Sequence, residues 1–268
     1  MQSIRATSSL SKKAMVASIA IVLCILSFFS NQASGHETHS REALSHSEAQ
    51  KPTATANYLA NEGILISAGN VKVLFDPFFH NDYNIYQLVP DKTLKAIMNN
   101  EAPYNDISAI FVSHAHGDHF AEQDMLDYML KHSAVELIAP AQAIAEMLKL
   151  DGFDKVKNRV TKIELAYEDA PISFTVKGIK VDAVRIPHAG WPGRADVSNI
   201  VFRVGLPQVD KDKRGLLTFI HMGDADPNDK HFRPLRAFWE AQKTTVAFPP
   251  YWFFLTNTGR SEERRVGK

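Results

Sequence analysis

Cysteine is almost absent from this 268-residue sequence, in which the only one, Cys24, lies inside an apolar run near the start. A single cysteine cannot form an intramolecular disulfide, so stability has to come from core packing and bound metal. No internal repeat is visible, which excludes a repeat protein. Hydrophobic residues make up 45% of the sequence and charged residues 22%, a composition typical of one large globular domain and not of a disordered chain.

Acidic residues are missing from residues 1–35, where three basic residues precede an apolar run over 14–29 and small residues follow at 33–35. This pattern predicts a secretory signal peptide, whose cleavage leaves a periplasmic or secreted protein. The alternative is an uncleaved membrane anchor, which fits less well because a bilayer span needs about 20 apolar residues. We therefore expect no stable membrane insertion once the leader is removed.

Polar segments flank the domain that we expect over residues 56–259. Residues 36–55 carry scattered histidines without apolar periodicity, which predicts a flexible linker. Residues 260–268 resemble the translation of a common sequencing adapter, and the alternative is a genuine solvated basic tail. The whole sequence has a net charge of zero. The leader contributes +3 of it and the tail +2, so residues 36–259 carry a net charge of −5. This mildly acidic balance disfavours a nucleic-acid partner.

Hydrophobic periodicity predicts both strands and helices. Apolar residues at strand spacing indicate one hairpin that turns at Gly69-Asn70 and a second that turns near Gly178. Further strands are predicted over 107–112, 135–139, 200–204 and 217–221, and helices over 123–131, 141–150 and 235–242. Because hairpins are mixed with alternating strands and helices, we expect two packed β-sheets covered by helices, and not a purely parallel sheet.

A cluster of potential metal ligands follows directly after the predicted strand 107–112. Its sequence is Ser-His-Ala-His-Gly-Asp-His, residues 113–119. Imidazole nitrogens and carboxylate oxygens suit Zn²⁺ and similar divalent ions. Without metal, desolvating three imidazoles and a carboxylate beside an apolar strand would be unfavourable. The cluster therefore predicts a metal site in which the first two histidines project together, and a turn at Gly117 aims Asp118 and His119 at a second ion.

The sequence resembles the metallo-β-lactamase superfamily, whose motif His-x-His-x-Asp-His is present over residues 114–119. Asp76-Pro77, Pro187-His188 and Gly223-Asp224 follow the family order as well. The resemblance implies an αββα sandwich of two mixed β-sheets flanked by helices, here C-terminally truncated. It also implies a centre that usually holds two zinc ions, or manganese or iron in some members.

The resemblance assigns a role to each of six ligands. These are His114, His116 and His188 for the first metal, Asp118 and His119 for the second, and Asp224 as a bridge between the two. The family commonly supplies one more histidine near the C-terminus, and none follows His231. We therefore expect the natural gene to continue beyond Gly259 and to encode it.

Other polar and aromatic residues are weaker candidates. Asp76 is expected either to orient a metal ligand or to cap the turn before Pro77. His221 is expected in the core more than beside the site. Trp191 and residues 251–254 are expected in the core or as an apolar wall of the site. The histidines expected at the surface or in packing are His80, His132 and His231.

The expected reaction is hydrolysis of a small-molecule substrate. Two metals that share a water lower its pKa to about 7, and the hydroxide then attacks a carbonyl or phosphoryl centre. Asp118, as the catalytic residue, would hold or accept the proton. Esters, lactones and phosphodiesters all suit this chemistry, and the resemblance points to a broad subgroup of lactonases and phosphodiesterases. The alternatives are an iron-dependent oxidoreductase on the same fold and a non-catalytic metal-binding protein.

Overall fold

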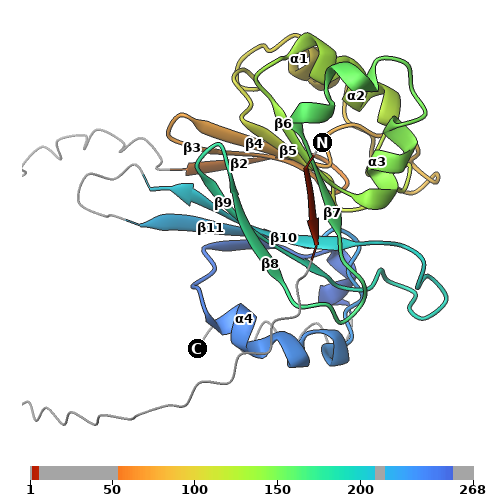
Figure 1. Cartoon of the computed structure of the whole chain (residues 1–268), viewed down its shortest axis with the longest axis vertical. Coiled ribbons are helices and arrows are strands. Elements are labelled where there is room, and N and C mark those ends of the chain that lie inside the picture. Colours follow the sequence, from red (N-terminus) through yellow and green to blue (C-terminus); the bar gives the residue numbers. More distant parts are fainter. Residues whose placement is uncertain (1, 6–53, 209–214, 256–268) are drawn as a thin grey trace, which may run out of the picture. The chain divides into compact units, whose positions relative to one another are not determined.

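The computed structural model describes residues 2–5, 54–208 and 215–255. They form two β-sheets that pack face to face (Figure 1). The first sheet has the strand order β1-β7-β6-β5-β4-β3-β2. Its strands are β1 (Gln2–Arg5), β2 (Ala54–Ala60), β3 (Gly63–Ala68), β4 (Val71–Phe75), β5 (Ala109–Phe111), β6 (Glu136–Pro140) and β7 (Val160–Glu164).

Pairing is mixed in both sheets. In the first, β2, β3 and β4 pair antiparallel, whereas β4, β5, β6, β7 and β1 pair parallel. The second sheet has the order β12-β11-β10-β9-β8, antiparallel except that β12 pairs parallel with β11. Its strands are β8 (Ile172–Val176), β9 (Ile179–Arg185), β10 (Ile200–Pro207), β11 (Leu216–His221) and β12 (Val246–Phe248).

Helices cover the outer faces of both sheets. The α-helices of the described residues are α1 (Asp91–Met98), α2 (Glu122–Lys131), α3 (Ala141–Met147) and α4 (Arg236–Glu240). Short 3₁₀ turns lie at Phe153–Lys155, Lys157–Arg159, Asp229–His231, Arg233–Leu235 and Tyr251–Phe254. Helices α1–α3 pack on the first sheet and α4 on the second, at the top and bottom of Figure 1. The predicted αββα sandwich is confirmed. Within the described ranges, no helix has the length and apolar character needed to cross a bilayer.

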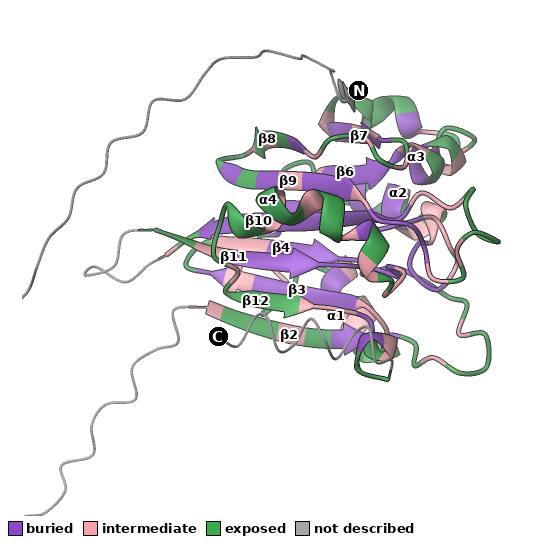
Figure 2. Ribbon diagram, turned by 90° about the horizontal axis from the view of Figure 1, so that it is seen from below, coloured by how far each residue is buried: buried purple, intermediate pink, exposed green. Residues whose placement is uncertain are grey.

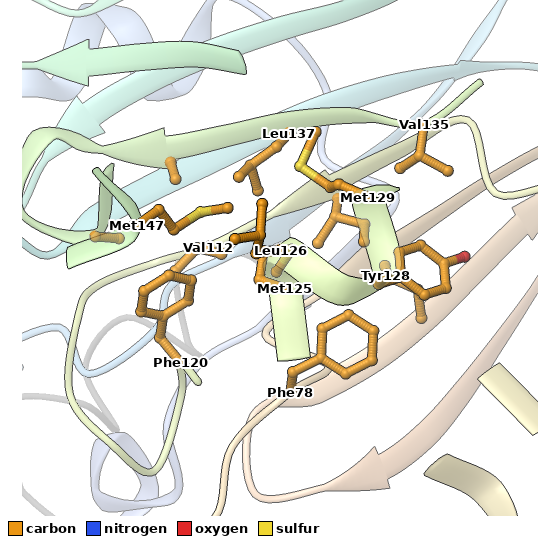
Figure 3. Packing of buried hydrophobic residues seen from close by; sticks show 14 of the residues in the cluster. Phe78, Val112, Phe120, Met125, Leu126, Tyr128, Met129, Val135, Leu137 and Met147 are labelled. Carbon is orange, nitrogen blue, oxygen red and sulfur yellow. The ribbon is translucent and has the colours of Figure 1, made fainter. Parts of the chain in front are cut away.

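Alternation along the strands divides the apolar residues between separate cores. In β4, Leu74 packs under the helices, while Val73 and Phe75 face the second sheet, as the two-residue period of a strand requires. Figure 3 shows the helix side, where Met125 of α2 and Leu137 of β6 belong to one cluster. A third core lies between the second sheet and α4. Each fully buried large apolar side chain contributes roughly 1.5–3 kcal/mol, so these cores stabilise the domain without a disulfide.

Burial falls from the centre of each sheet to its edge, as Figure 2 shows. Strands β4 and β10 are mostly buried, whereas the edge strands β2 and β12 carry exposed residues. The buried hairpins, β10, β11 and α2 confirm their predictions. Strand β7, helix α1 and strand β12 were not predicted. Strand β7 is short and carries charged Lys162 and Glu164 beside its buried residues. Helix α1 buries a single residue completely, Ile97, and β12 has no buried residue.

Two predicted boundaries bear on the ends of the domain. Strand β2 begins at Ala54, so the domain starts before the predicted linker 36–55 ends. Backbone pairing of Ala54 with Ala68 extends the strand although its side chains are largely exposed, so hydrophobicity did not mark its start. Strand β1 belongs to the predicted leader, and cleavage would leave β7 at the edge of the sheet. The rest of the leader, residues 36–53 and the predicted tail 260–268 lie outside the described residues.

Candidate metal centre

Three loops at the carboxyl ends of strands bring the predicted ligands together. The His-x-His-x-Asp-His segment follows β5, His188 follows β9, and Asp224 follows β11. Asp118 lies beside the centre, with Oδ2 at 3.6 Å from Nε2 of His119. The other five predicted ligands form two groups that could hold a metal ion, namely His114, His116 and His188, and His114, His119 and Asp224.

The first group consists of three histidines. Nε2 of His114 lies 3.1 Å from Nδ1 of His116. The ring centroid of His188 lies 4.9 Å from that of His114 and 4.7 Å from that of His116. One nitrogen from each ring lies within 4.8 Å of the other two. Three imidazole nitrogens around one point are a ligand set typical of zinc.

The second group shares His114 and adds His119 and Asp224. The Asp224 carboxylate faces both groups, with Oδ1 at 3.2 Å from Nε2 of His119 and Oδ2 at 3.2 Å from Nε2 of His188. Oδ1 of Asp118 is buried and has no hydrogen-bond partner among the described residues. Nε2 of His188 is also buried, and its 3.2 Å approach to Asp224 is not a hydrogen bond, so it has no such partner either. Buried polar atoms without a partner are costly unless a cation or water satisfies them. The donor set therefore fits divalent cations.

Asp76, which follows β4, orients two of the histidines. Its buried carboxylate accepts hydrogen bonds from the backbone N (2.7 Å) and Oγ (2.5 Å) of Ser113 and from Nδ1 of His119 (2.9 Å). Because the only proton of the Ser113 hydroxyl points to Asp76, Nδ1 of His114 has to be the donor in its 3.0 Å contact with Oγ. Both histidines thus carry a proton on Nδ1 and turn Nε2 to the centre. Of the two roles expected for Asp76, orientation of ligands agrees with these contacts.

His188 is held by the backbone of the Asp224 loop. An isolated β-bridge joins His188 to Ala225, and N of Ala189 donates to O of Asp224 at 2.7 Å. Nδ1 of His188 donates to O of Ala189 at 2.7 Å, since a carbonyl oxygen only accepts. The lone pair of His188 is therefore on Nε2, the atom that faces Asp224.

Close packing beneath Asp224 requires glycine at position 223. A Cβ there would lie 2.6 Å from both Oδ1 of Asn199 and Cβ of Ser113, and φ is +51°. The Asn199 side chain accepts from N of Asp224 (3.0 Å) and donates to O of Met222 (3.1 Å). These contacts place the Asp224 carboxylate against the loop after β5.

Gly117 has a different role from the predicted one. Its φ is not in the positive range, so the turn between His116 and His119 does not depend on the backbone freedom of glycine. Its carbonyl accepts from the backbone N of His80 (3.3 Å) and Asn81 (3.0 Å), and a Cβ would lie 3.2 Å from Cβ of Asn81. The missing side chain instead lets the segment after β4 pack against the ligand loop.

Burial and neighbouring charges set the protonation of the ligands. Burial lowers the pKa of His116 to about 4 and holds the pKa of His114 well below its usual value, so both rings are neutral at pH 7. Burial also opposes the charge of His119, but Asp224 and Asp76 outweigh it and raise the His119 pKa well above its usual value. His119 in turn outweighs burial at Asp224 and holds that pKa well below its usual range. Without a cation, a proton on His119 thus balances Asp224.

We expect cation binding at the second group to release about one proton, because that proton occupies the Nε2 atom that the cation needs. The first group contributes none through His114 or His116, which are already neutral. Apparent affinity should therefore rise with pH, by about tenfold per unit below the His119 pKa. Calorimetric titration with Zn²⁺ in two buffers of different ionisation enthalpy gives the proton count. Binding without pH dependence between about pH 6 and 8 would contradict the His119–Asp224 ion pair.

The remaining predicted histidines lie outside the two groups. His221 is fully buried, donates through Nε2 to O of Glu62 (2.8 Å) and stacks on Phe75, so its expected place in the core is confirmed. The others make surface or packing contacts with their neighbours, as expected: His80 with Asp124, His132 with Met98, and His231 with Tyr167.

The site opens into a cleft of about 570 Å³ that is lined in part by Tyr83, Ile85 and Tyr86 from the segment after β4. Trp191 packs against Tyr167 instead, with the two rings tilted by 47°, and Phe253 of the 251–254 segment is buried in the third core. The expected apolar wall therefore comes from a segment for which the sequence predicted no role in the site. The sequence signal that could have marked this segment as part of the site was two tyrosines in a short polar stretch without periodicity.

Sequence reasoning also missed two polar residues near the ligand loop, one of which bonds to it. Nδ2 of Asn61 donates to the backbone O of Asp118 at 2.9 Å. Burial raises the pKa of the neighbouring Glu62 to about 8. Both residues lie in the turn between β2 and β3, and a polar pair between two apolar strands looks like an ordinary turn in a single sequence.

The comparisons with known proteins agree with this geometry. The profile of the β-lactamase superfamily domain matches residues 71–238, more than half of the chain. No curated protein matches the chain.

Similar solved structures are distant from the chain. A candidate metal-dependent hydrolase from Parabacteroides distasonis shares 15% identity at a TM-score of 0.42, over 66% of this chain and 63% of its own. A possible metal-dependent hydrolase from Veillonella parvula shares 15% identity at a TM-score of 0.41, over 68% of this chain and 67% of its own. An isothiocyanate hydrolase from Delia radicum gut bacteria shares 13% identity at a TM-score of 0.39, over 68% of this chain and 67% of its own. These similarities carry no argument about the reaction. The domain match over most of the sandwich shows that the chain belongs to the metallo-β-lactamase superfamily.

Proposed function

We propose that this protein is a hydrolase that uses two divalent cations, preferably zinc, to cleave an ester, lactone or phosphodiester bond of a small molecule. The observation that carries the proposal is the position of Asp224. Its two carboxylate oxygens lie 3.2 Å from histidine nitrogens of different groups. A carboxylate with one oxygen toward each group suits a bridge between two cations, the arrangement used in dinuclear hydrolytic sites.

The two groups support the following ligand assignment, apart from Asp118, which belongs to neither group and comes from the family resemblance. His114, His116 and His188 would hold one cation, and His119 with Asp118 would hold the other, while Asp224 serves both. The partnerless atoms Oδ1 of Asp118 and Nε2 of His188 support this division, because a cation would satisfy both of them.

Cations at these positions would lower the pKa of water to near 7 and polarise a carbonyl or phosphoryl group. Asp118 lines the cleft and has a buried carboxylate oxygen without a hydrogen-bond partner among the described residues. Burial raises its pKa, which makes the carboxylate a better acceptor for the proton of an attacking water. The cleft of about 570 Å³ is of the size that takes a small molecule, for which roughly 300–1,000 Å³ is usual.

The place of action is a further part of the proposal. The basic start, apolar run and small residues of the leader support export to the periplasm or the medium. The net charge of −5 over residues 36–259 supports a small molecule over a nucleic acid as the partner.

Elemental analysis tests the proposal most directly. Protein expressed with zinc, manganese or iron should retain about two ions per chain, and zinc-loaded protein should hydrolyse members of a panel of nitrophenyl esters, lactones and phosphodiesters. Absence of any transition metal after supplementation would contradict the proposal. Two bound irons with oxygen consumption and no hydrolysis would favour an oxidoreductase. Bound zinc without turnover would favour a non-catalytic metal-binding protein.

A further inference from the structure

One guanidinium group lies in the cleft beside the metal centre. Arg194 lines this cleft together with His116, Asp118 and Asp224. In the part of the chain that the structure describes, no hydrogen bond or ion pair engages its side chain. Within residues 54–208 and 215–255, the other arginine side chains all have such partners: Arg159, Arg185, Arg203, Arg233 and Arg236.

The loop that carries Arg194 is held in place by its neighbours. Arg185 of β9 donates through Nη2 to O of Ala195 at 2.8 Å. Gln142 of α3 donates to O of Asp196 at 2.7 Å and accepts from N of Ser198 at 2.8 Å. Strand β9 of the second sheet and helix α3 on the first sheet thus both hold the loop. Because its backbone is fixed in this way, the loop keeps Arg194 in the cleft.

Arg194 shares the cleft with Tyr86. Burial raises the pKa of this tyrosine, and the positive charge of Arg194 opposes the rise. Asp196 lines the same cleft, but no ion pair joins it to Arg194. The guanidinium is therefore close to the reacting end of the cleft and free to bind an incoming group.

We propose that Arg194 binds a carboxylate or phosphate group of the substrate, so that the site selects negatively charged molecules. A guanidinium offers a planar set of N–H donors that matches two oxygens of such a group. The domain as a whole is acidic, with a net charge of −5 over residues 36–259, and so repels anions at long range. An anionic substrate therefore depends on local positive charge, and beside the bound cations Arg194 is the one arginine or lysine among the described residues that line the cleft. This inference rests on the proposed hydrolase function and names its substrate class.

The test compares Arg194→Gln with Arg236→Gln, which removes the same charge from an exposed position on α4. Zinc-loaded proteins are assayed with p-nitrophenyl acetate, which is neutral, and with mono-p-nitrophenyl succinate, which carries a carboxylate. We expect Arg194→Gln to raise KM for the succinate ester about fivefold, as loss of an exposed ion pair allows, so that the preference for the succinate ester over the acetate ester falls by a similar factor, whereas Arg236→Gln keeps the wild-type preference. Arg194→Lys should raise KM for the succinate ester less than Arg194→Gln does, since lysine keeps the positive charge but lacks the planar set of N–H donors.

A binding measurement separates this inference from the proposed function and distinguishes the two anions. Calorimetric titration of the metal-free and zinc-loaded proteins with succinate and with inorganic phosphate should show weaker binding in Arg194→Gln and wild-type binding in Arg236→Gln. Loss confined to one anion identifies the group that Arg194 takes. Weaker anion binding without any ester hydrolysis would uphold the anion site and contradict the hydrolase. Equal behaviour of the two variants toward every anion, or no anion binding by the wild type, would overturn the inference.

Discussion

Replacement of His116 by alanine should lower kcat/KM for hydrolysis by about a thousandfold or more, because a cation that stabilises the transition state contributes several kcal/mol. His116 provides one of three ring nitrogens in the first group, and its ring is only half-buried. It belongs to none of the three apolar cores. Loss of the ring should therefore remove a cation while the domain stays folded. Assays with an ester identified by the panel, together with zinc content and circular dichroism, measure the three quantities.

His80→Ala is the matched control for this variant. His80 lies in the segment that packs against the ligand loop, but its exposed ring pairs with Asp124 and takes no part in either metal group. Its replacement should leave zinc content and turnover unchanged. Full activity in His116→Ala would refute the role assigned to this histidine.

The local part of the site could be predicted from the sequence because its ligands are close together in the chain. Residues 114–119 present three histidines and an aspartate directly after a buried strand. A strand followed by a turn has few ways to arrange them. His188 and Asp224 are distant in sequence from this segment, and nothing in their own segments distinguishes them from neighbouring polar residues, so family resemblance alone suggested them.

The rest of the site depends on contacts that no sequence period records. Asn199 and Gly223 matter because the ends of β9 and β11 approach Ser113 closely. Arg194 reaches the cleft because Arg185 and Gln142 hold its loop. Each of these residues is ordinary in its own segment, and its role appears only when three loops meet.

The same limit applies to the fold. Strands with alternating burial and the amphipathic helix α2 follow from periodicity, because one face of each has to be apolar. The start of β2 and the whole of β12 depend on backbone pairing with a neighbouring strand, which exposed side chains also permit. Edge elements are therefore the part of this sandwich that the pattern of side chains reveals least.

Replacement of Asp76 by asparagine should weaken zinc binding about 10–100-fold, the loss typical when a residue that orients a metal ligand is removed. The Asp76 carboxylate accepts three hydrogen bonds, two from Ser113 and one from Nδ1 of His119. Asparagine keeps the size but has one acceptor oxygen, and its NH₂ group opposes a ring N–H donor. Asp76→Ala leaves the His119 charge without this partner and should also lower the free energy of unfolding of the metal-free protein, by about 3–5 kcal/mol.

Two measurements distinguish orientation of ligands from simple support of the fold. Zinc dissociation constants report on orientation, and urea unfolding of the metal-free protein reports on support. Asp76→Asn should change the first far more than the second. Asp154→Asn, at an exposed side chain paired with Lys157 on the surface, should change neither. If Asp76→Asn bound zinc as tightly as the wild type and lost only stability, Asp76 would be a structural residue beneath the loop, and the proton positions inferred for His114 and His119 would need another source.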